Sequence, residues 1–361
     1  MKLAIVVGTR PEIIKMAPVV RACVARRVPY VLLHTGQHYS FELDGVFFEE
    51  LGLPRPHRNL EVGSGTQSYQ IAAVIEKLAP VLEAERPDVV LVEGDTNSVL
   101  AAALAANKGG IAVGHVEAGL RSYDRGMPEE INRVLTDHLA EWLFAPTTNA
   151  RDILIGEGIA AERVVVTGNT VVDELLLQRP RAERPELFER FGVTRGGYAL
   201  ATVHRAENVD VDARLRAILA GLDAAGRGLE LPVLAALHPR TTTRMAALGL
   251  AATGALRALP PLGYLDFLGL QAGAALVLTD SGGLQEEACA LGVPCVTLRD
   301  NTERPESVAV GANVLAGADA DRIVACARRM AARPRTWTNP FGDGRSGERI
   351  VAHLAGGAPV D

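Results

Sequence analysis

A glycine-rich turn followed by an acid and an arginine is the part of this sequence that most clearly indicates chemistry. Ser281-Gly282-Gly283 follows the apolar run Ala275–Leu278, which is typical of a buried strand, and Leu284–Leu291 then has helical spacing. Such a turn leaves backbone N–H groups and the positive end of the helix dipole available to a phosphate. Glu287, one turn into the helix, can accept hydrogen bonds from ribose hydroxyls, and Arg304 can donate several to a diphosphate. The turn alone fits a plain strand-turn-helix, but the acid and the arginine favour a nucleotide-diphosphate site.

Three acids are placed where they can supply acid–base chemistry. Asp95 and Glu117 each follow a predicted strand, and Glu129 lies near the start of a helix that Pro128 is expected to open. Close carboxyl groups disfavour simultaneous ionisation, which raises at least one pKa and lets one carboxyl act as acid while another acts as base. The structural alternatives are helix capping for Asp95 and Glu117, and an i,i+4 pair with Arg133 for Glu129. Because all three acids are expected opposite a phosphate site, we favour a catalytic role over these structural alternatives.

A histidine also follows a predicted strand, whereas metal and nicotinamide motifs are missing from the sequence. His204, beside Arg205, can donate to a phosphate oxygen and favour departure of a nucleotide diphosphate; the alternative is a loop histidine bonded to backbone. His34 and His38 fall in a strand-to-loop region, with no His-Glu-x-x-His and no aspartate cluster. The first strand runs into Gly8-Thr9-Arg10-Pro11-Glu12 rather than Gly-x-Gly-x-x-Gly. We expect neither a metal nor a nicotinamide cofactor.

Apolar strand-like runs alternate with helix-like stretches along the whole chain, which predicts parallel sheets covered by helices on both faces. The predicted strands are Leu3–Val7, Tyr30–His34, Val89–Val92, Ala112–Val116, Leu143–Ala145, Val164–Val166, Tyr198–Val203, Val233–Leu237, Ala255–Leu259, Ala275–Leu278, Cys295–Leu298 and Asn313–Leu315. Two sets of six predict two doubly wound domains, residues 1–177 and 178–339. The boundary is expected between Leu177 and Gly197, where residues 178–185 are polar and broken by prolines.

The carboxyl ends of these strands gather the candidate residues. Ligands of open parallel sheets bind outside those ends, so the segments after strands in both domains are expected at two sheet edges. If the edges face one another, they form a deep cleft in which one wall grips a nucleotide diphosphate and the other carries carboxylates.

Bulk composition limits the class of protein. The chain has 361 residues, enough for two domains, with 48% hydrophobic and 22% charged residues, as in ordinary soluble globular proteins. A formal net charge of −6 argues against a nucleic-acid or anionic-membrane partner, and no segment is long and apolar enough to span a membrane. Four scattered cysteines, Cys23, Cys289, Cys295 and Cys326, are typical of reduced core residues in a cytoplasmic protein.

Taken together and in order, these segments resemble the non-hydrolysing UDP-N-acetylglucosamine 2-epimerase family over almost the whole chain. The segments that carry the resemblance are residues 8–15 (GTRPEIIK), 94–97 (GDTN), 115–122 (HVEAGLRS), 127–133 (MPEEINR), 168–170 (GNT), 204–208 (HRAEN), 279–287 (TDSGGLQEE), 299–306 (RDNTERPE) and 339–344 (NPFGDG).

The resemblance implies two Rossmann-like domains in a glycosyltransferase-B arrangement, with a final helix of about Arg345–Leu354, within residues 340–361, returning to the first domain. It implies interconversion of UDP-N-acetylglucosamine and UDP-N-acetylmannosamine through a 2-acetamidoglucal intermediate, without NAD or a metal, by a homodimer. The residues that match the family's catalytic acids and histidine are Asp95, Glu117, Glu129 and His204. The residues that match its UDP-sugar contacts are Arg10, Lys15, Phe267, Ser281, Gly282, Gly283, Glu287 and Arg304.

One departure and several rival functions accompany the resemblance. Many bacterial members use an arginine in the loop that here reads Gln37-His38-Tyr39-Ser40 to bind substrate as an activator, and Tyr39 in its place weakens that expectation. The rivals are an epimerase for a related UDP-sugar such as a diacetamido-uronic acid, a hydrolysing relative that releases N-acetylmannosamine and UDP, and a glycosyltransferase of the same architecture. A catalytically silent nucleotide-sugar sensor is disfavoured, because a sensor needs no set of acids.

Overall fold

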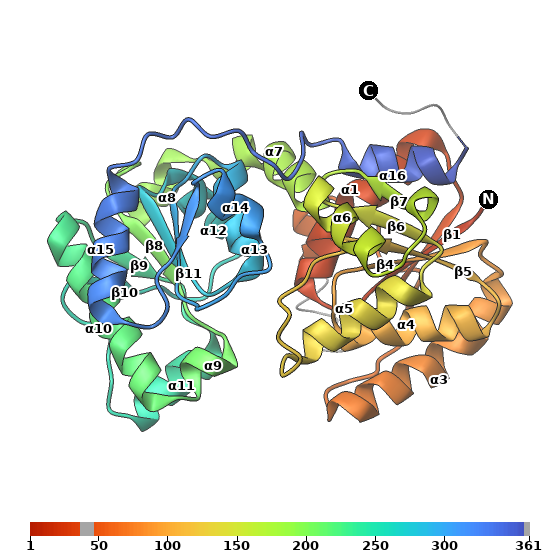
Figure 1. The fold of residues 1–361 in the computed structure, drawn as a ribbon, viewed down its shortest axis with the longest axis horizontal. Coiled ribbons are helices and arrows are strands. Elements are labelled where there is room, and N and C mark those ends of the chain that lie inside the picture. Colours follow the sequence, from red (N-terminus) through yellow and green to blue (C-terminus); the bar gives the residue numbers. More distant parts are fainter. Residues whose placement is uncertain (37–46, 357–361) are drawn as a thin grey trace. The chain divides into compact units, whose positions relative to one another are not determined.

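The computed structural model of the chain describes residues 1–36 and 47–356 and divides into two compact units, each drawn around its own sheet in Figure 1. Unit 1 comprises Met1–Glu174 with Phe341–Asp361, and unit 2 comprises Leu175–Pro340. All strand pairs in both sheets are parallel. The predicted fold class, two doubly wound parallel-sheet domains, is therefore confirmed.

Unit 1 contains a 7-stranded sheet of order β3-β2-β1-β4-β5-β6-β7. Its strands are β1 (Leu3–Val7), β2 (Tyr30–His34), β3 (Arg58–Asn59), β4 (Val89–Glu93), β5 (Ala112–Val116), β6 (Trp142–Ala145) and β7 (Val164–Val166). Its helices are α1 (Arg10–Arg26), α3 (Gln67–Glu85), α4 (Asn97–Lys108), α5 (Pro128–Leu139), α6 (Thr148–Gly156) and α16 (Ser346–Leu354), with a 3₁₀ turn at Ala161–Arg163. The prediction of six strands misses β3, because two residues are too short to form a recognisable apolar run.

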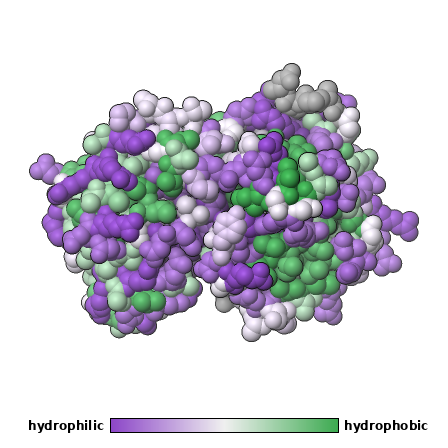
Figure 2. Space-filling view, viewed as in Figure 1, coloured by the Kyte–Doolittle hydropathy of each residue, from purple (hydrophilic) through white to green (hydrophobic). Residues whose placement is uncertain are grey.

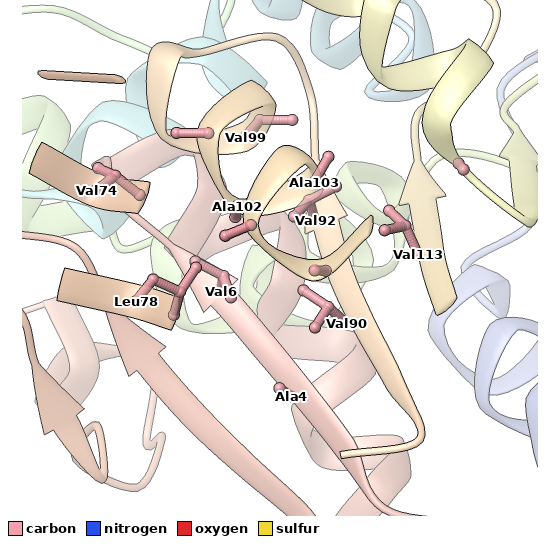
Figure 3. Packing of buried hydrophobic residues seen from close by; sticks show 14 of the residues in the cluster. Ala4, Val6, Val74, Leu78, Val90, Val92, Val99, Ala102, Ala103 and Val113 are labelled. Atoms are coloured by element: carbon pink, nitrogen blue, oxygen red, sulfur yellow. The ribbon is translucent and has the colours of Figure 1, made fainter. Parts of the chain in front are cut away.

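One layer of the core of unit 1 lies between the sheet and the helices α3 and α4 (Figure 3). Side chains alternate across a strand, so Ala4 and Val6 of β1 share one face with Val90 and Val92 of β4. Fully burying a valine or leucine contributes about 1.5–3 kcal/mol, which makes this layer a main source of the unit's stability. The alanine-rich sequence of α4 favours a helix, and the Thr96 hydroxyl caps it by accepting from the N–H of Val99.

Unit 2 contains a 6-stranded sheet of order β10-β9-β8-β11-β12-β13. Its strands are β8 (Ala199–Thr202), β9 (Val233–Ala235), β10 (Leu256–Ala258), β11 (Leu276–Thr279), β12 (Cys295–Thr297) and β13 (Asn313–Leu315). Its helices are α8 (Pro185–Arg190), α9 (Ala206–Val209), α10 (Asp212–Leu229), α11 (Pro239–Ala247), α12 (Tyr264–Gly273), α13 (Gly282–Ala290), α14 (Pro305–Ala309) and α15 (Ala320–Ala331). Helices α10 and α15 pack against each other over one core.

The polar, proline-containing segment at residues 178–185 is helical except at Glu183 and Arg184. Helix α7 (Thr170–Ala182) continues through Pro180, and α8 begins at Pro185. A proline in the first turn of a helix loses no hydrogen bond, and an ion pair of 2.7 Å between Arg179 Nε and Glu183 Oε1 supports the end of α7. The division between the units falls inside α7, between Glu174 and Leu175.

The cysteines lie in the core, as their apolar sequence neighbours predicted. All four cysteines are free and buried, as predicted, and burial raises the pKa of Cys23 and of Cys289 to about 12. Within the described ranges, no helix is long and apolar enough to cross a membrane. The face shown in Figure 2 carries hydrophilic and hydrophobic residues interspersed on both units.

Candidate active site

The acids of unit 1 gather where the strand order of its sheet reverses. Strand β1 lies between β2 and β4, so the helices that follow β1 and β4 leave the sheet in opposite directions and open a crevice at the carboxyl ends. Lys15 lies in α1 after β1, Asp95 follows β4, and Glu117 follows the neighbouring β5. The topology thus places these three residues at one sheet edge.

Glu117 is held by a lysine and an amide. The Lys15 ammonium lies 2.6 Å from Glu117 Oε2 and 2.9 Å from Glu93 Oε1, and Asn169 Nδ2 donates to Glu117 Oε2 over 2.7 Å. Glu117 has a φ of 68°, a left-handed conformation that costs a non-glycine residue about 1–2 kcal/mol. The next helix, α5, is capped by Met127, so Glu117 does not serve as its N-cap. A buried, strained carboxylate beside an ammonium is typical of a functional position.

Asp95 is tied to the first turns of α5. Its carboxylate pairs with Arg133, and its carbonyl accepts from Asn132 Nδ2 over 2.9 Å. Because Thr96 caps α4, the structural alternative for Asp95 as a helix cap is not realised. These contacts bring the start of α5, with Glu129, to the same edge of the sheet as Asp95.

The two glutamates at the start of α5 have different surroundings. Glu130 is buried and accepts from the N–H of Ser122 over 2.8 Å, from the N–H of Tyr123 over 3.0 Å and from Arg133. Glu130 therefore anchors the loop before α5. Arg133 uses Glu130 and Asp95 as its partners rather than Glu129, so the i,i+4 alternative for Glu129 is also not realised. Glu129 is half-buried in the first turn of α5.

A buried glutamate of α1 connects the loops after β1 and β4. Glu12 accepts from the N–H of Gly8 over 2.6 Å, from Thr9 Oγ1 over 2.9 Å and from Thr96 Oγ1 over 2.8 Å. Burial raises the pKa of Glu12 to about 7, although these hydrogen bonds oppose the shift. Glu12 thus holds Thr96, the residue that follows Asp95.

A second buried network holds the end of β5. His115 Nδ1 lies 2.7 Å from Asp137 Oδ1, and His115 Nε2 lies 2.8 Å from the carbonyl oxygen of Gly94. A carboxylate and a carbonyl oxygen thus face the two ring nitrogens, so both nitrogens help to hold the imidazole. Burial alone would raise the pKa of Asp137, but His115 and Arg121 hold it below its ordinary value. The network fixes Gly94, directly before Asp95.

His204 lies at the corresponding reversal of strand order in unit 2, between β8 and β11. Its Nδ1 is 2.8 Å from Oδ1 of the buried Asp280, whose Oδ2 accepts from the backbone N–H groups of His204 and Arg205 over 3.0 and 2.9 Å. Burial would raise the pKa of Asp280, but these hydrogen bonds lower it, so the residue is a stable carboxylate. With Nδ1 engaged, the Nε2 of His204 is the nitrogen that can reach a ligand.

The helix after β11 begins earlier than the sequence predicted. Helix α13 starts at Gly282 rather than at Leu284, and Ser281 is its N-cap. The two glycines therefore form the first turn of the helix instead of a separate loop, because a serine N-cap can satisfy the N–H of Leu284. Their N–H groups are among those that a helix leaves unpaired.

The remaining phosphate-site residues surround this first helical turn. A Cβ built on Gly282 would lie 3.9 Å from Arg304 Cζ, and one built on Gly283 would lie 3.9 Å from Glu287 Oε1 and 4.0 Å from Ser281 Oγ. Arg304 is buried, and its Nε is 2.7 Å from Glu286 Oε2. The structure thus brings Ser281, the glycines, Glu287 and Arg304 together, as the sequence predicted for one site.

The sequence predicted three other features of the site, namely Arg10, Phe267 and the loop at residues 37–40. Arg10 is exposed at the start of α1, and its Cζ lies 4.9 Å from the centroid of the Phe47 ring. Phe267 is half-buried in α12, and no hydrogen bond or ring contact between described residues joins it to the first turn of α13. The segment Gln37-His38-Tyr39-Ser40 lies outside the described residues.

In residues 1–36 and 47–356, no group of three or more His, Cys, Asp or Glu side chains could hold a metal ion.

Comparisons with known proteins agree with this arrangement. Residues 21–355 match the family model described as UDP-N-acetylglucosamine 2-epimerase. The chain is 49% identical, over 99% of its length and 100% of the other protein, to the UDP-N-acetylglucosamine 2-epimerase of Methanocaldococcus jannaschii. The chain belongs to the UDP-N-acetylglucosamine 2-epimerase family. This finding confirms the resemblance seen in the sequence motifs.

Two further matches within this epimerase family cover almost the whole chain. The crystal structure of the Methanocaldococcus jannaschii enzyme in complex with UDP-GlcNAc and UDP matches with a TM-score of 0.93, at 49% identity and with 99% of this chain and 100% of that chain covered. The chain is also 41% identical, over 98% of its length and 99% of the other protein, to the UDP-2,3-diacetamido-2,3-dideoxy-D-glucuronate 2-epimerase of Pseudomonas aeruginosa.

Sequence reasoning missed several residues that this member of the epimerase family places beside the predicted ones. Glu93 and Asp280 are acids at the ends of apolar strands, and Glu12 lies one helical turn before Lys15. An acid that ends an otherwise apolar strand is costly to bury unless it is paired, and that signal could have identified Glu93 and Asp280. Their partners, by contrast, are contributed by distant segments.

Proposed function

We propose that this protein interconverts UDP-N-acetylglucosamine and UDP-N-acetylmannosamine by eliminating UDP and adding it back. The observation that supports this best is the chemical difference between the two strand-order reversals. In unit 1 the reversal carries Asp95, Glu117 and Lys15, whereas in unit 2 it carries His204 and the first turn of α13. The first set suits proton transfer at carbon, and the second suits a diphosphate.

The reaction needs this division of work because the C2 hydrogen of the sugar is not adjacent to a carbonyl group. Loosening the bond between C1 and the UDP oxygen builds positive charge at C1 and acidifies C2. A carboxylate then takes the C2 proton, the C–H electron pair forms a C1=C2 double bond, and the C1–O pair leaves with UDP. The product is a 2-acetamidoglucal, to which a proton returns on the opposite face as UDP adds to C1.

The unit 2 residues are proposed to hold UDP and favour its departure. His204 Nε2 donates to a diphosphate oxygen, with Asp280 fixing the orientation of the ring. Arg304 and the N–H groups of the first turn of α13 bind the negative charge that grows on the leaving diphosphate. Glu287, one turn further along α13, accepts from the ribose hydroxyls.

The unit 1 residues are proposed to move the proton. Two differently placed groups are required, one to remove the C2 proton and one to return a proton to the other face. Glu117, Asp95 and Glu129 supply these groups, while Lys15 and Arg133 hold the first two in place.

An incubation with UDP-N-acetylglucosamine in D₂O, followed by NMR, tests this function. We expect UDP-N-acetylmannosamine to form with deuterium at C2, because the proton exchanges with solvent while it resides on a carboxyl group. An unchanged, unlabelled sugar would reject the function. Free N-acetylmannosamine with UDP would instead indicate the hydrolysing reaction.

A diacetamido-uronic acid substrate is the second candidate, and the 41% identity to the Pseudomonas aeruginosa enzyme is the observation that favours it. The same NMR assay with UDP-2,3-diacetamido-2,3-dideoxy-D-glucuronate distinguishes the two substrates by their relative kcat/KM. The homodimer and the cytoplasmic location expected from the sequence stay predictions, and light scattering on the purified protein measures the first of them.

A further inference from the structure

We propose that Glu93 is a positioning residue that keeps Glu117 basic enough to accept a proton from carbon, by sharing the single ammonium of Lys15 with it. This inference rests on the proposed function, because it names the group that tunes one of the proposed proton acceptors. None of the sequence motifs assigned Glu93 a role.

The geometry of the three groups is fixed by secondary structure. Glu93 is the last residue of β4, and its register partner Val116 directly precedes Glu117. Lys15 reaches both carboxylates from α1, with Nζ 2.9 Å from Glu93 Oε1 and 2.6 Å from Glu117 Oε2. The side chains of Lys15, Glu93 and Glu117 are only 13%, 2% and 4% exposed, so solvent screens their interactions weakly.

The charge of this cluster explains why a second carboxylate matters. An ammonium facing one buried carboxylate forms a neutral pair, which favours the ionised acid and makes it a poor base. With two carboxylates the cluster carries one net negative charge when all three groups are ionised, and one added proton makes it neutral. Uptake of a proton is therefore favoured, and the proton belongs to the pair of acids.

The groups around Glu93 link its charge to that of Glu117. Burial raises the pKa of Glu93 well above its ordinary value; Lys15 opposes this shift, whereas Glu117 and Glu12 reinforce it. Asn169 contributes a neutral N–H to Glu117. Lys15 is the cation that faces both carboxylates, and the two glutamates compete for it.

This arrangement balances the charge of the Lys15, Glu93 and Glu117 cluster during the proposed step. When Glu117 takes the C2 proton, an O–H bond forms on Glu117, the C–H electron pair becomes the C1=C2 bond, and the C1–O pair leaves with UDP. The cluster passes from one negative charge to neutral, while the Lys15–Glu93 ion pair remains. Without the Glu93 charge, the same step would leave an unpaired buried ammonium, which is unfavourable.

Glu93→Gln tests the inference through the pH profile of turnover. Removing the negative charge lowers the pH at which Glu117 takes up a proton, so the acidic limb of kcat is expected to move down by about one pH unit. Turnover on the plateau is expected to fall roughly 10-fold, because a weaker base removes the proton more slowly, while KM changes little. Glu93→Asp keeps a carboxylate and is expected to restore the limb toward its wild-type position.

A matched variant separates this effect from loss of a buried charge. Glu174 is also a buried acid of unit 1, and it pairs with Arg21. Glu174→Gln is expected to lower the melting temperature without moving the acidic limb. An acidic limb of Glu93→Gln that superimposes on that of the wild type would overturn the inference, and so would a Glu93→Asp variant that behaves like Glu93→Gln.

A titration without substrate keeps the inference distinct from the proposed function. Carbon-13 NMR of protein labelled at the glutamate carboxyl carbons, with the Glu117 signal assigned from Glu117→Gln, follows the charge of Glu117 directly. We expect its titration midpoint to fall in Glu93→Gln. An unchanged midpoint would overturn the inference even in an active epimerase, whereas a shifted midpoint in a protein that epimerises no sugar would contradict the proposed function alone.

Discussion

Gly283 lies where the protein itself does not require a glycine. The nearest atoms that a Cβ at this position would meet are Glu287 Oε1 at 3.9 Å and Ser281 Oγ at 4.0 Å, which are ordinary contacts. Its neighbour Gly282 is more confined, because a Cβ there would lie 3.3 Å from Glu303 Oε2. Packing therefore gives no reason for a glycine at this position, whereas the proposed approach of a phosphate to the backbone does.

Gly283→Ala is therefore expected to separate stability from binding. The free energy of unfolding should stay the same or rise by up to about 1 kcal/mol, because alanine is the better helix former. The affinity for UDP should fall roughly 10-fold, or by about 1.4 kcal/mol, because the methyl group obstructs the N–H groups of the first turn. Calorimetric measurement of UDP binding and of thermal unfolding checks both, and an unchanged affinity would show that this turn does not contact the diphosphate.

Single-residue roles at these sites depend on partners from other segments. Asp280 fixes His204 through Nδ1, and Lys15 joins Glu93 to Glu117 across three elements. The sequence could predict that His204 and Glu117 follow strands. It could not predict their partners, because those pairings depend on which side chains the packed sheet brings within reach.

At the scale of elements, helix α1 positions much of the unit 1 site. Its first turns carry Glu12 and Lys15, and α16 packs across its far side. The contact with α16 is close, since a Cβ on Gly347 would lie 2.7 Å from the backbone carbon of Pro18. The N–H of Gly347 also donates to Asp173 Oδ1 over 2.8 Å. The C-terminal helix therefore supports the helix that carries Glu12 and Lys15.

Gly347→Ala is expected to loosen this packing. Overpacking of a close contact costs about 1–3 kcal/mol, and each kcal/mol lowers the melting temperature of a unit of this size by about 2–4 °C. Gly156→Ala is the matched control, because Gly156 ends α6 and a Cβ there would meet nothing within 4 Å. Thermal unfolding followed by circular dichroism compares the two. Equal melting temperatures would show that α16 tolerates a larger separation from α1.

Helices and strands could be predicted from the sequence where their side chains are buried on one face or on both faces. Every strand predicted from an apolar run is found, with ends that differ by two residues or fewer. The errors have local causes. Strand β3 has two residues, α7 tolerates Pro180 near its end, and the N-cap Ser281 lets Gly282 and Gly283 join α13.

At the scale of the whole molecule, the chain uses the same parallel-sheet plan twice and places different chemistry at each reversal of strand order. Unit 1 presents carboxylates held by Lys15 and Arg133, and unit 2 presents the Asp280-oriented His204 beside a helix N-terminus. The proposed reaction requires both sets of groups, one for the proton and one for UDP. A variant in one unit should therefore disturb one partial function and spare the other.

The most direct test of this account compares proton transfer with UDP binding in Asp95→Asn and Glu117→Gln. Both variants should wash deuterium from D₂O into C2 of the sugar about 100- to 10,000-fold more slowly than the wild type. Both should bind UDP with a Kd within a few-fold of the wild-type value, because the proposed diphosphate contacts lie in unit 2. Parallel loss of UDP binding and deuterium exchange in both variants would contradict the account, since the two acids would then maintain the fold rather than move the proton.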